Sequence, residues 1–95
     1  MISETSQESY EQIKPRLGSR EQEVFEALKY LNREGRDATD YELTIYLEQK
    51  DPNYVRPRRY DLVNKHKLVG FSQKRTCSVT GKMALAWKVL MRKLN

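Results

Sequence analysis

Residues 68–89 read LVGFSQKRTCSVTGKMALAWKV, and this stretch decides the class of fold. Its first residues, 68–72, are rich in apolar side chains and favour a strand. In residues 83–89 large apolar side chains alternate with alanine and lysine, which is the pattern of a second strand. The segment between them is polar and basic and ends in Thr80-Gly81-Lys82, which has the chemistry of a hairpin tip. We therefore expect a two-stranded β-hairpin, with Phe71, Leu85 and Trp87 contributing to the core.

Two helices with recognisable start signals are expected upstream of this hairpin. The first follows Ser19-Arg-Glu-Gln22, which has the form of a capping box, and Gly35 should end it near residues 33–34. The second follows a clearer capping box, Thr39-Asp-Tyr-Glu42, and should end near residues 49–50, before a turn-forming Asp-Pro-Asn. Residues 36–38 between them are a short connector or a minimal strand.

Pro57 fixes the start of a third helix. A proline deep inside a helix would break it, so Pro57 belongs in the first turn and the helix begins near residues 54–56. It should continue to about residue 66. The order of elements, α-(short β)-α-α-β-β, predicts an α+β fold of the winged helix-turn-helix class, with three helices followed by a two-stranded β-hairpin wing. At 95 residues the chain makes one domain.

We expect that domain to span residues 9–90, between a flexible N-terminus at residues 1–8 and a basic tail at residues 91–95. Positive and negative side chains are unevenly distributed along the whole chain. Residues 1–55 hold seven Lys/Arg and twelve Asp/Glu, a net charge of −5, whereas residues 56–95 hold eleven Lys/Arg and a single acid, Asp61, a net charge of +10. A basic excess of this kind is typical of a surface that binds a polyanion. The alternative explanation is a basic face that only contacts solvent, and the near-absence of acids in residues 56–95 disfavours it.

Residues 9–89 resemble a group of small winged-helix DNA-binding proteins common in bacteriophages and prophages. The most specific similarity is the wing pattern K-R-x-C-x-V-T-G-x-x-A-x-x-W, here Lys74-Arg-Thr-Cys-Ser-Val-Thr-Gly-Lys-Met-Ala-Leu-Ala-Trp87. The third helix matches V-x-P-R-x-x-D/E-L, here Val55-Arg-Pro-Arg-Arg-Tyr-Asp-Leu62, and the opening segment SYEQIKPRLGSR and the second helix TDYELTIYL are also similar. The resemblance implies a winged-helix fold and DNA binding, without a target.

The chain departs from that group at two places. His66-Lys67 precede the apolar pair of the wing where glycine is usual, and Arg59 stands where an apolar side chain is expected. Two explanations are open for Arg59. Either it extends from the edge of the core, or the helix is rotated so that Tyr60 and Val63 pack instead.

The third helix is the expected recognition helix, because the major groove accommodates a helix and Arg and Asn can bind base edges through two hydrogen bonds each. Arg56, near the helix N-terminus, is the strongest candidate, whereas Arg58 and Arg59 could face either DNA or the protein. In the wing, lysine and arginine side chains suit phosphate contact, and Thr76, Ser78 and Thr80 are weaker candidates. The DNA-binding residues expected from the sequence are Asn53, Tyr54, Arg56, Arg58, Arg59, Tyr60, Asn64, Lys74, Arg75 and Lys82.

Catalytic and metal chemistry are disfavoured. Cys77 and His66 are the only residues of their types, which is too few for a zinc site, and no nucleophile-and-base set is visible. With Asp61 the only acid in the basic half, a two-metal nuclease site is also disfavoured. We expect no enzyme activity, no metal, no cofactor and no small-molecule ligand.

The compartment follows from what the sequence lacks. No stretch has the length of apolar residues needed to cross a membrane, and the N-terminus has no secretory apolar region. We expect no membrane partner and a cytoplasmic, nucleoid-associated protein, in the host cell if a phage encodes it.

These observations predict sequence-specific binding of double-stranded DNA, in a small phage or prophage regulator of transcription or replication. The alternative is a winged-helix module that docks an acidic protein partner through its basic face. A homodimer is possible, and the acidic first helix, with Phe25 and Tyr30, is the place to look for its contact.

Overall fold

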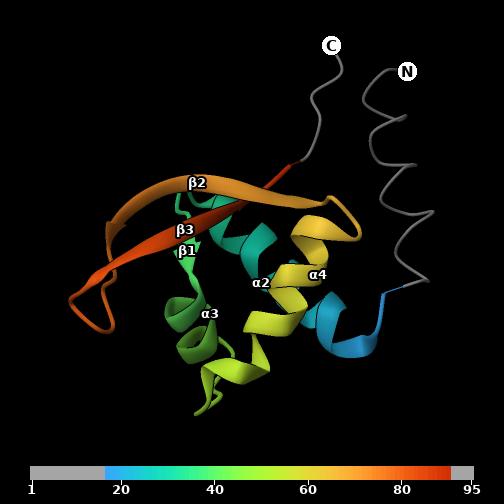
Figure 1. Cartoon of the computed structure of the whole chain (residues 1–95), viewed down its shortest axis with the longest axis horizontal. Helices are drawn as coiled ribbons and strands as arrows, with labels where there is room; N and C mark the ends of the chain where they lie inside the picture. The colour runs from blue at the N-terminus through green and yellow to red at the C-terminus, as the bar shows by residue number, and fades with distance from the viewer. Residues whose placement is uncertain (1–16, 91–95) are drawn as a thin grey trace.

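The computed structural model of the chain describes residues 17–90, so the segments expected at residues 1–8 and 91–95 lie outside the described residues. The described part is an α+β fold with three α-helices and one antiparallel sheet, in which the helices lie together on one side of the sheet (Figure 1). The elements, in chain order, are α2 (Ser19–Arg33), β1 (Ala38–Thr39), α3 (Asp40–Tyr46), the 3₁₀ turn η2 (Pro52–Tyr54), α4 (Arg56–Asn64), β2 (Val69–Thr76) and β3 (Met83–Val89).

The sheet has three strands in the order β1-β3-β2. The expected pair of strands is present, with Lys74 opposite Leu85, but β1 adds a third strand by placing Ala38 opposite Trp87. The prediction of a two-stranded sheet was therefore wrong. A strand of two residues has too little periodicity to show its partner, although the short connector was recognised. β2 also continues to Thr76 rather than ending at residue 72, because its polar second half still pairs with β3.

The starts of the helices follow local backbone chemistry. The capping box at α3 is confirmed: the Thr39 amide donates to Glu42 Oε1 (3.1 Å), and the Glu42 amide donates to Thr39 Oγ1 (3.2 Å). At α2 the expected box is displaced by one residue, since the Gly18 amide donates to Glu21 Oε1 (3.1 Å). Glycine has no side chain, so the second hydrogen bond of a capping box is not formed there. α4 begins at Arg56 with Pro57 in its first turn, as predicted.

The ends of the helices were predicted less well. α2 ends at Arg33, followed by Gly35 in the left-handed region (φ +80°), as expected. α3 ends at Tyr46 instead of residues 49–50, because Glu48 already adopts a left-handed conformation (φ +58°) that stops the helix. α4 ends at Asn64, two residues earlier than expected.

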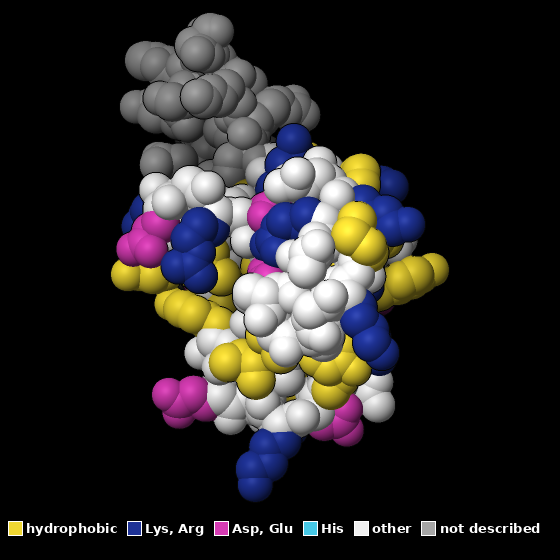
Figure 2. Space-filling model, turned by 90° about the vertical axis from the view of Figure 1, so that its left-hand side faces the viewer, with side chains coloured by type: hydrophobic (Ala, Val, Ile, Leu, Met, Phe, Trp, Pro, Cys, Tyr) yellow, Lys and Arg dark blue, Asp and Glu magenta, His cyan; other side chains and the backbone are white. Residues whose placement is uncertain are grey.

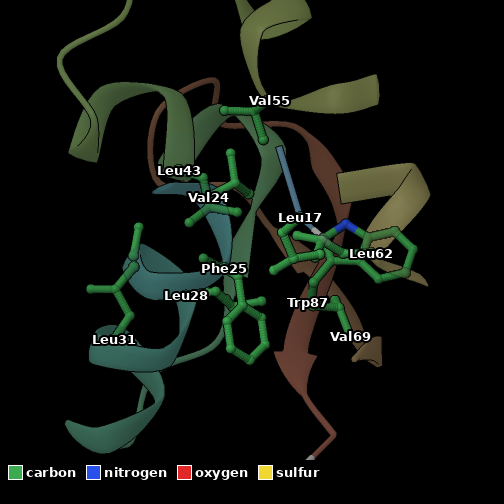
Figure 3. Packing of buried hydrophobic residues seen from close by; sticks show 12 residues of the cluster. Leu17, Val24, Phe25, Leu28, Leu31, Leu43, Val55, Leu62, Val69 and Trp87 are labelled. Carbon is green, nitrogen blue, oxygen red and sulfur yellow. The ribbon is translucent and has the colours of Figure 1, made fainter. Parts of the chain in front are cut away.

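One apolar cluster joins the helices to the sheet (Figure 3). It is built from side chains of α2, α3, α4 and the strands, among them Val24, Phe25, Leu28, Leu43, Val55, Leu62, Val69 and Trp87. Trp87 is 8% exposed and belongs to this core as predicted. Phe71 and Leu85 do not, because they are 53% and 46% exposed, although the Phe71 ring lies edge-on to that of Trp87 with centroids 6.3 Å apart.

Candidate functional site

The outer face of α4 carries three exposed polar side chains in a row. Leu62 is fully buried, whereas Arg56, Tyr60 and Asn64 are exposed and follow one another at intervals of four residues. Residues at that spacing lie along one side of a helix. The Asn64 side-chain amide donates to the Tyr60 carbonyl (3.1 Å), which anchors the last member of the row. We call these three residues the outer stripe of α4.

Arg56 is the member of the outer stripe best placed to bind an external anion. Its guanidinium carbon lies 5.5 Å from the ring centroid of Tyr41, in the first turn of α3, and it forms no ion pair within residues 17–90. The aromatic ring supports the guanidinium without occupying its hydrogen-bond donors. Tyr41 was not among the predicted residues, because its contact with Arg56 is tertiary and leaves no mark on the local sequence.

Arg59 has the opposite role, and the first of the two explanations offered for it holds. It extends from the edge of the core and donates to both carboxylate oxygens of Asp40, from Nε at 2.9 Å and from Nη2 at 2.8 Å. Its guanidinium carbon also lies 4.2 Å from the centroid of the Trp87 ring. Tyr60 is 60% exposed, so α4 is not rotated toward it. The donors of Arg59 are therefore directed into the protein.

This difference between two arginines one turn apart is testable. We expect Arg59→Ala to lower the free energy of unfolding by about 2 kcal/mol, because it leaves the partly buried Asp40 carboxylate unpaired and uncovers Trp87. Arg56→Ala, the matched control, should change it by less than about 0.5 kcal/mol. Urea denaturation measures both. Equal effects from the two variants would contradict this assignment.

The residues just before α4 and in its first turn are directed mostly toward α2. The Tyr54 hydroxyl donates to a carboxylate oxygen of Glu23, which raises the pKa of Tyr54. The guanidinium carbons of Arg20 and Arg58 lie 5.1 and 5.9 Å from the centroid of the same ring. Tyr54 and Arg58 are thus half-buried and lie off the outer stripe. Asn53 is exposed, in η2 at the N-terminal approach to α4.

The three basic hairpin residues predicted to bind DNA also differ in whether they pair with acidic side chains. Lys74 and Lys82 are exposed and make no ion pair with any described residue. Arg75 instead donates from Nε to Asp37 Oδ1 (2.9 Å), from Nη2 to Glu42 Oε1 (2.7 Å) and from Nη1 to Glu42 Oε2 (2.9 Å). These bonds join β2 to the start of α3 and to the connector before β1. Arg75 therefore holds the hairpin in place.

Glu42 is the centre of this network. Hydrogen bonding from Arg75, together with bonds from Ser78 and Thr39, lowers the pKa of Glu42 to about 2 despite its burial. The Ser78 amide and hydroxyl both donate to Glu42 Oε2, at 2.8 and 2.9 Å. Asp37 is similar: burial opposes its ionisation, but bonds from Gln73, Ser72 and Arg75 outweigh that effect and lower its pKa. The Glu42 carboxylate, which also caps α3, thus holds the loop of residues 77–82 against that helix.

A groove of about 360 Å³ separates the N-terminal half of α4 from the hairpin. It brings together Arg56 from the helix and Lys82 from the loop, with Tyr41, Arg59, Leu85 and Trp87 among the lining residues. Lys74 lies opposite Leu85 in the β2–β3 register, so the two side chains share a face of the sheet. We call this region, formed by the outer stripe, the groove, Lys74 and Lys82, the α4–hairpin surface.

The surface is positive because its acidic neighbours are already paired. Arg59 pairs with Asp40, and Arg75 pairs with both Asp37 and Glu42, whereas Arg56, Lys74 and Lys82 have no opposing carboxylate in an ion pair within residues 17–90. Figure 2 views the end of the molecule where the loop of residues 77–82 projects. Hydrophobic patches there are interspersed with Lys and Arg side chains, and the most prominent acidic side chains lie toward the margins.

Other kinds of site find little support in the described part of the chain. Residues 17–90 contain no group of three or more His, Cys, Asp or Glu side chains that could hold a metal ion. His66 Nε2 lies 3.2 Å from Glu21 Oε1, and the buried Cys77 sulfur lies 3.1 Å from Thr39 Oγ1. Both residues therefore have structural partners. None of the helices in that range is long and apolar enough to span a bilayer.

Comparison with family models gave no match to the chain, and no curated protein sequence matched it. The geometry of the α4–hairpin surface is therefore the observation that bears on function.

Proposed function

We propose that the protein is a winged helix-turn-helix domain that binds double-stranded DNA through the α4–hairpin surface. One observation carries the proposal. Arg56 and Lys82 line one groove, from the helix and from the loop, without ion-pair partners in residues 17–90, while Arg59 and Arg75 pair with the acids behind them. Such an arrangement leaves a helix and a hairpin loop as adjacent cationic elements, which is what a DNA backbone and groove require together.

In this proposal α4 enters the major groove and presents its outer stripe to the base edges. Arg56 suits guanine, whose O6 and N7 accept two hydrogen bonds, and the Asn64 amide suits adenine N6 and N7. Asn64 already donates to the Tyr60 carbonyl, so its orientation is partly set before binding. Tyr60 lies between them with 60% of its surface exposed and can contact bases or sugars. α3, η2 and α4 form the helix-turn-helix.

The hairpin is the proposed wing. Lys74 and Lys82 are suited to phosphates of the adjacent backbone, which position a protein on DNA without specifying sequence. The Glu42–Arg75–Ser78 network fixes the loop before DNA arrives, so little ordering is needed on binding. Arg75 contributes by holding the wing rather than by touching DNA.

The role that fits a domain of this size is a small regulator of transcription or replication acting in the cytoplasm at the nucleoid, and not an enzyme. The resemblance of residues 9–89 to phage and prophage winged-helix proteins supports that role. Docking of an acidic protein partner is the second candidate function. It is favoured by the exposed apolar side chains Phe71, Met83 and Leu85 on the hairpin, for which DNA phosphates offer no counterpart.

Fluorescence anisotropy with a labelled duplex at two salt concentrations tests the proposal. Neutralisation of three to four phosphates predicts that affinity falls roughly 40- to 150-fold between about 50 and 200 mM salt. A glutamate-rich peptide of equal charge should bind far more weakly than the duplex. Absence of a duplex signal at micromolar protein and low salt would overturn the proposal, and tighter binding of the peptide would favour the second candidate.

A further inference from the structure

The solvent-facing side of α2 carries a row of residues that the DNA-binding proposal does not use. Glu23, Glu26, Tyr30 and Arg33 are exposed and recur at intervals of three and four residues, which aligns them along one side of the helix. At 100° per residue this row lies opposite the fully buried Leu28. We call it the α2 stripe. None of its residues lines the groove between α4 and the hairpin.

The middle of the α2 stripe is aromatic and adjoins further apolar surface. Tyr30 is 48% exposed, and its ring stacks on that of Tyr46 from α3, with centroids 6.1 Å apart and planes inclined by 28°. Tyr46 is 43% exposed and its neighbour Ile45 58%. A groove of about 400 Å³ runs between the two helices beside these rings and is lined in part by Ala27 and Leu47. Exposed aromatic surface of this kind is enriched at protein interfaces.

The charges of the α2 stripe are ordered along the helix. The acids Glu23 and Glu26 precede Tyr30, and the base Arg33 follows it. If a second α2 packs antiparallel about a two-fold axis level with Tyr30, Glu26 of each copy lies opposite Arg33 of the other, and the tyrosines meet at the centre. A two-fold interface requires such self-complementarity, because every contact is made twice.

We propose that the α2 stripe is a homodimer interface, in which the occupant is a second copy of this chain packed antiparallel along α2. Charge order decides between occupants. A partner of one charge sign would place like charges together at one end of the stripe. A second copy instead places opposite charges against both Glu26 and Arg33. No residue of the α2 stripe belongs to the α4–hairpin surface, so the proposal does not depend on whether the protein binds DNA.

Sedimentation equilibrium at up to about 100 µM protein tests the proposal, since weak interfaces become populated at such concentrations. The wild-type chain should show a monomer–dimer equilibrium. Arg33→Glu should weaken it at least about tenfold, because two attractions become two repulsions. Glu26→Arg should weaken it similarly, and the double variant Glu26→Arg with Arg33→Glu should recover most of the lost affinity, since the exchanged pair is again complementary.

Lys65→Glu is the matched control, an equal charge reversal at an exposed residue just beyond α4, and should leave dimerisation unchanged. Circular dichroism confirms that each variant is folded. A wild-type chain that stays monomeric throughout the concentration range would overturn the proposal. So would a dimer that Arg33→Glu and Glu26→Arg leave intact, or one that the double variant fails to restore.

Discussion

Arg75→Ala should lower the free energy of unfolding by about 3 kcal/mol at pH 7, because it removes the partner of two largely buried carboxylates. The side chains of Asp37 and Glu42 are 14% and 13% exposed, and both pair with this single guanidinium. Without it, Glu42 keeps its bonds from Thr39 and Ser78 but has no compensating charge. Urea denaturation measures the loss.

The loss should depend on pH in a defined direction. The pKa of Glu42 is lowered from 4.5 to about 2 in the folded chain, so its ionised form stabilises folding above pH 4.5, and that contribution is lost as pH falls toward 2. Asp37 acts in the same direction. The gap in stability between wild type and Arg75→Ala should therefore narrow from pH 4.5 to 2. Lys74→Ala, the exposed neighbour, should show neither effect, and a gap of constant size down to pH 2 would contradict the ion-pair origin.

The double variant Arg56→Glu with Lys82→Glu should bind duplex DNA at least about 100-fold more weakly at low salt. The two residues face the same groove, so reversing both replaces two attractions to phosphates or bases with two repulsions. Neither side chain forms an ion pair within residues 17–90, so the free energy of unfolding should hardly change. Anisotropy with the labelled duplex gives the affinity, and urea denaturation confirms the fold.

A control with the same change in net charge separates local contact from bulk electrostatics. Arg36 and Lys88 are exposed and share a different groove, formed by the end of α2, the following loop, β2 and β3. Arg36→Glu with Lys88→Glu should weaken DNA binding by less than about tenfold, through long-range attraction alone. Equal losses in the two double variants would show that the α4–hairpin surface has no special role.

Local chemistry predicted much of the fold. The Thr39–Glu42 box, the position of Pro57 and the alternation in residues 83–89 each act through neighbours in sequence, and each gave an element close to its observed place. Partners distant in sequence could not be predicted. The pairing of β1 with β3 joins residues almost fifty positions apart, and the sequence Ala38–Thr39 does not identify β3 as the pairing strand.

The candidate site shows the same division. Arg56, Tyr60 and Asn64 were expected from the sequence to contact DNA, and the structure exposes all three. The sequence marked Arg59 as standing where an apolar side chain is expected, but only the fold shows that Asp40 and Trp87 contact it there. Arg75 shows most clearly what could not be predicted from the sequence. Its sequence neighbours suggest a basic loop, whereas its ion pairs with Asp37 and Glu42 come from segments more than thirty residues away.

Titration of ¹⁵N-labelled protein with duplex DNA, followed through backbone amide shifts, tests most directly whether the α4–hairpin surface binds DNA. The largest shifts should fall on Arg56, Tyr60 and Asn64 of α4 and on Lys82 of the loop, while Tyr30 on α2 stays unchanged. Shifts confined to α2 and α3, or no shifts with duplex in excess at low salt, would contradict DNA binding by this surface.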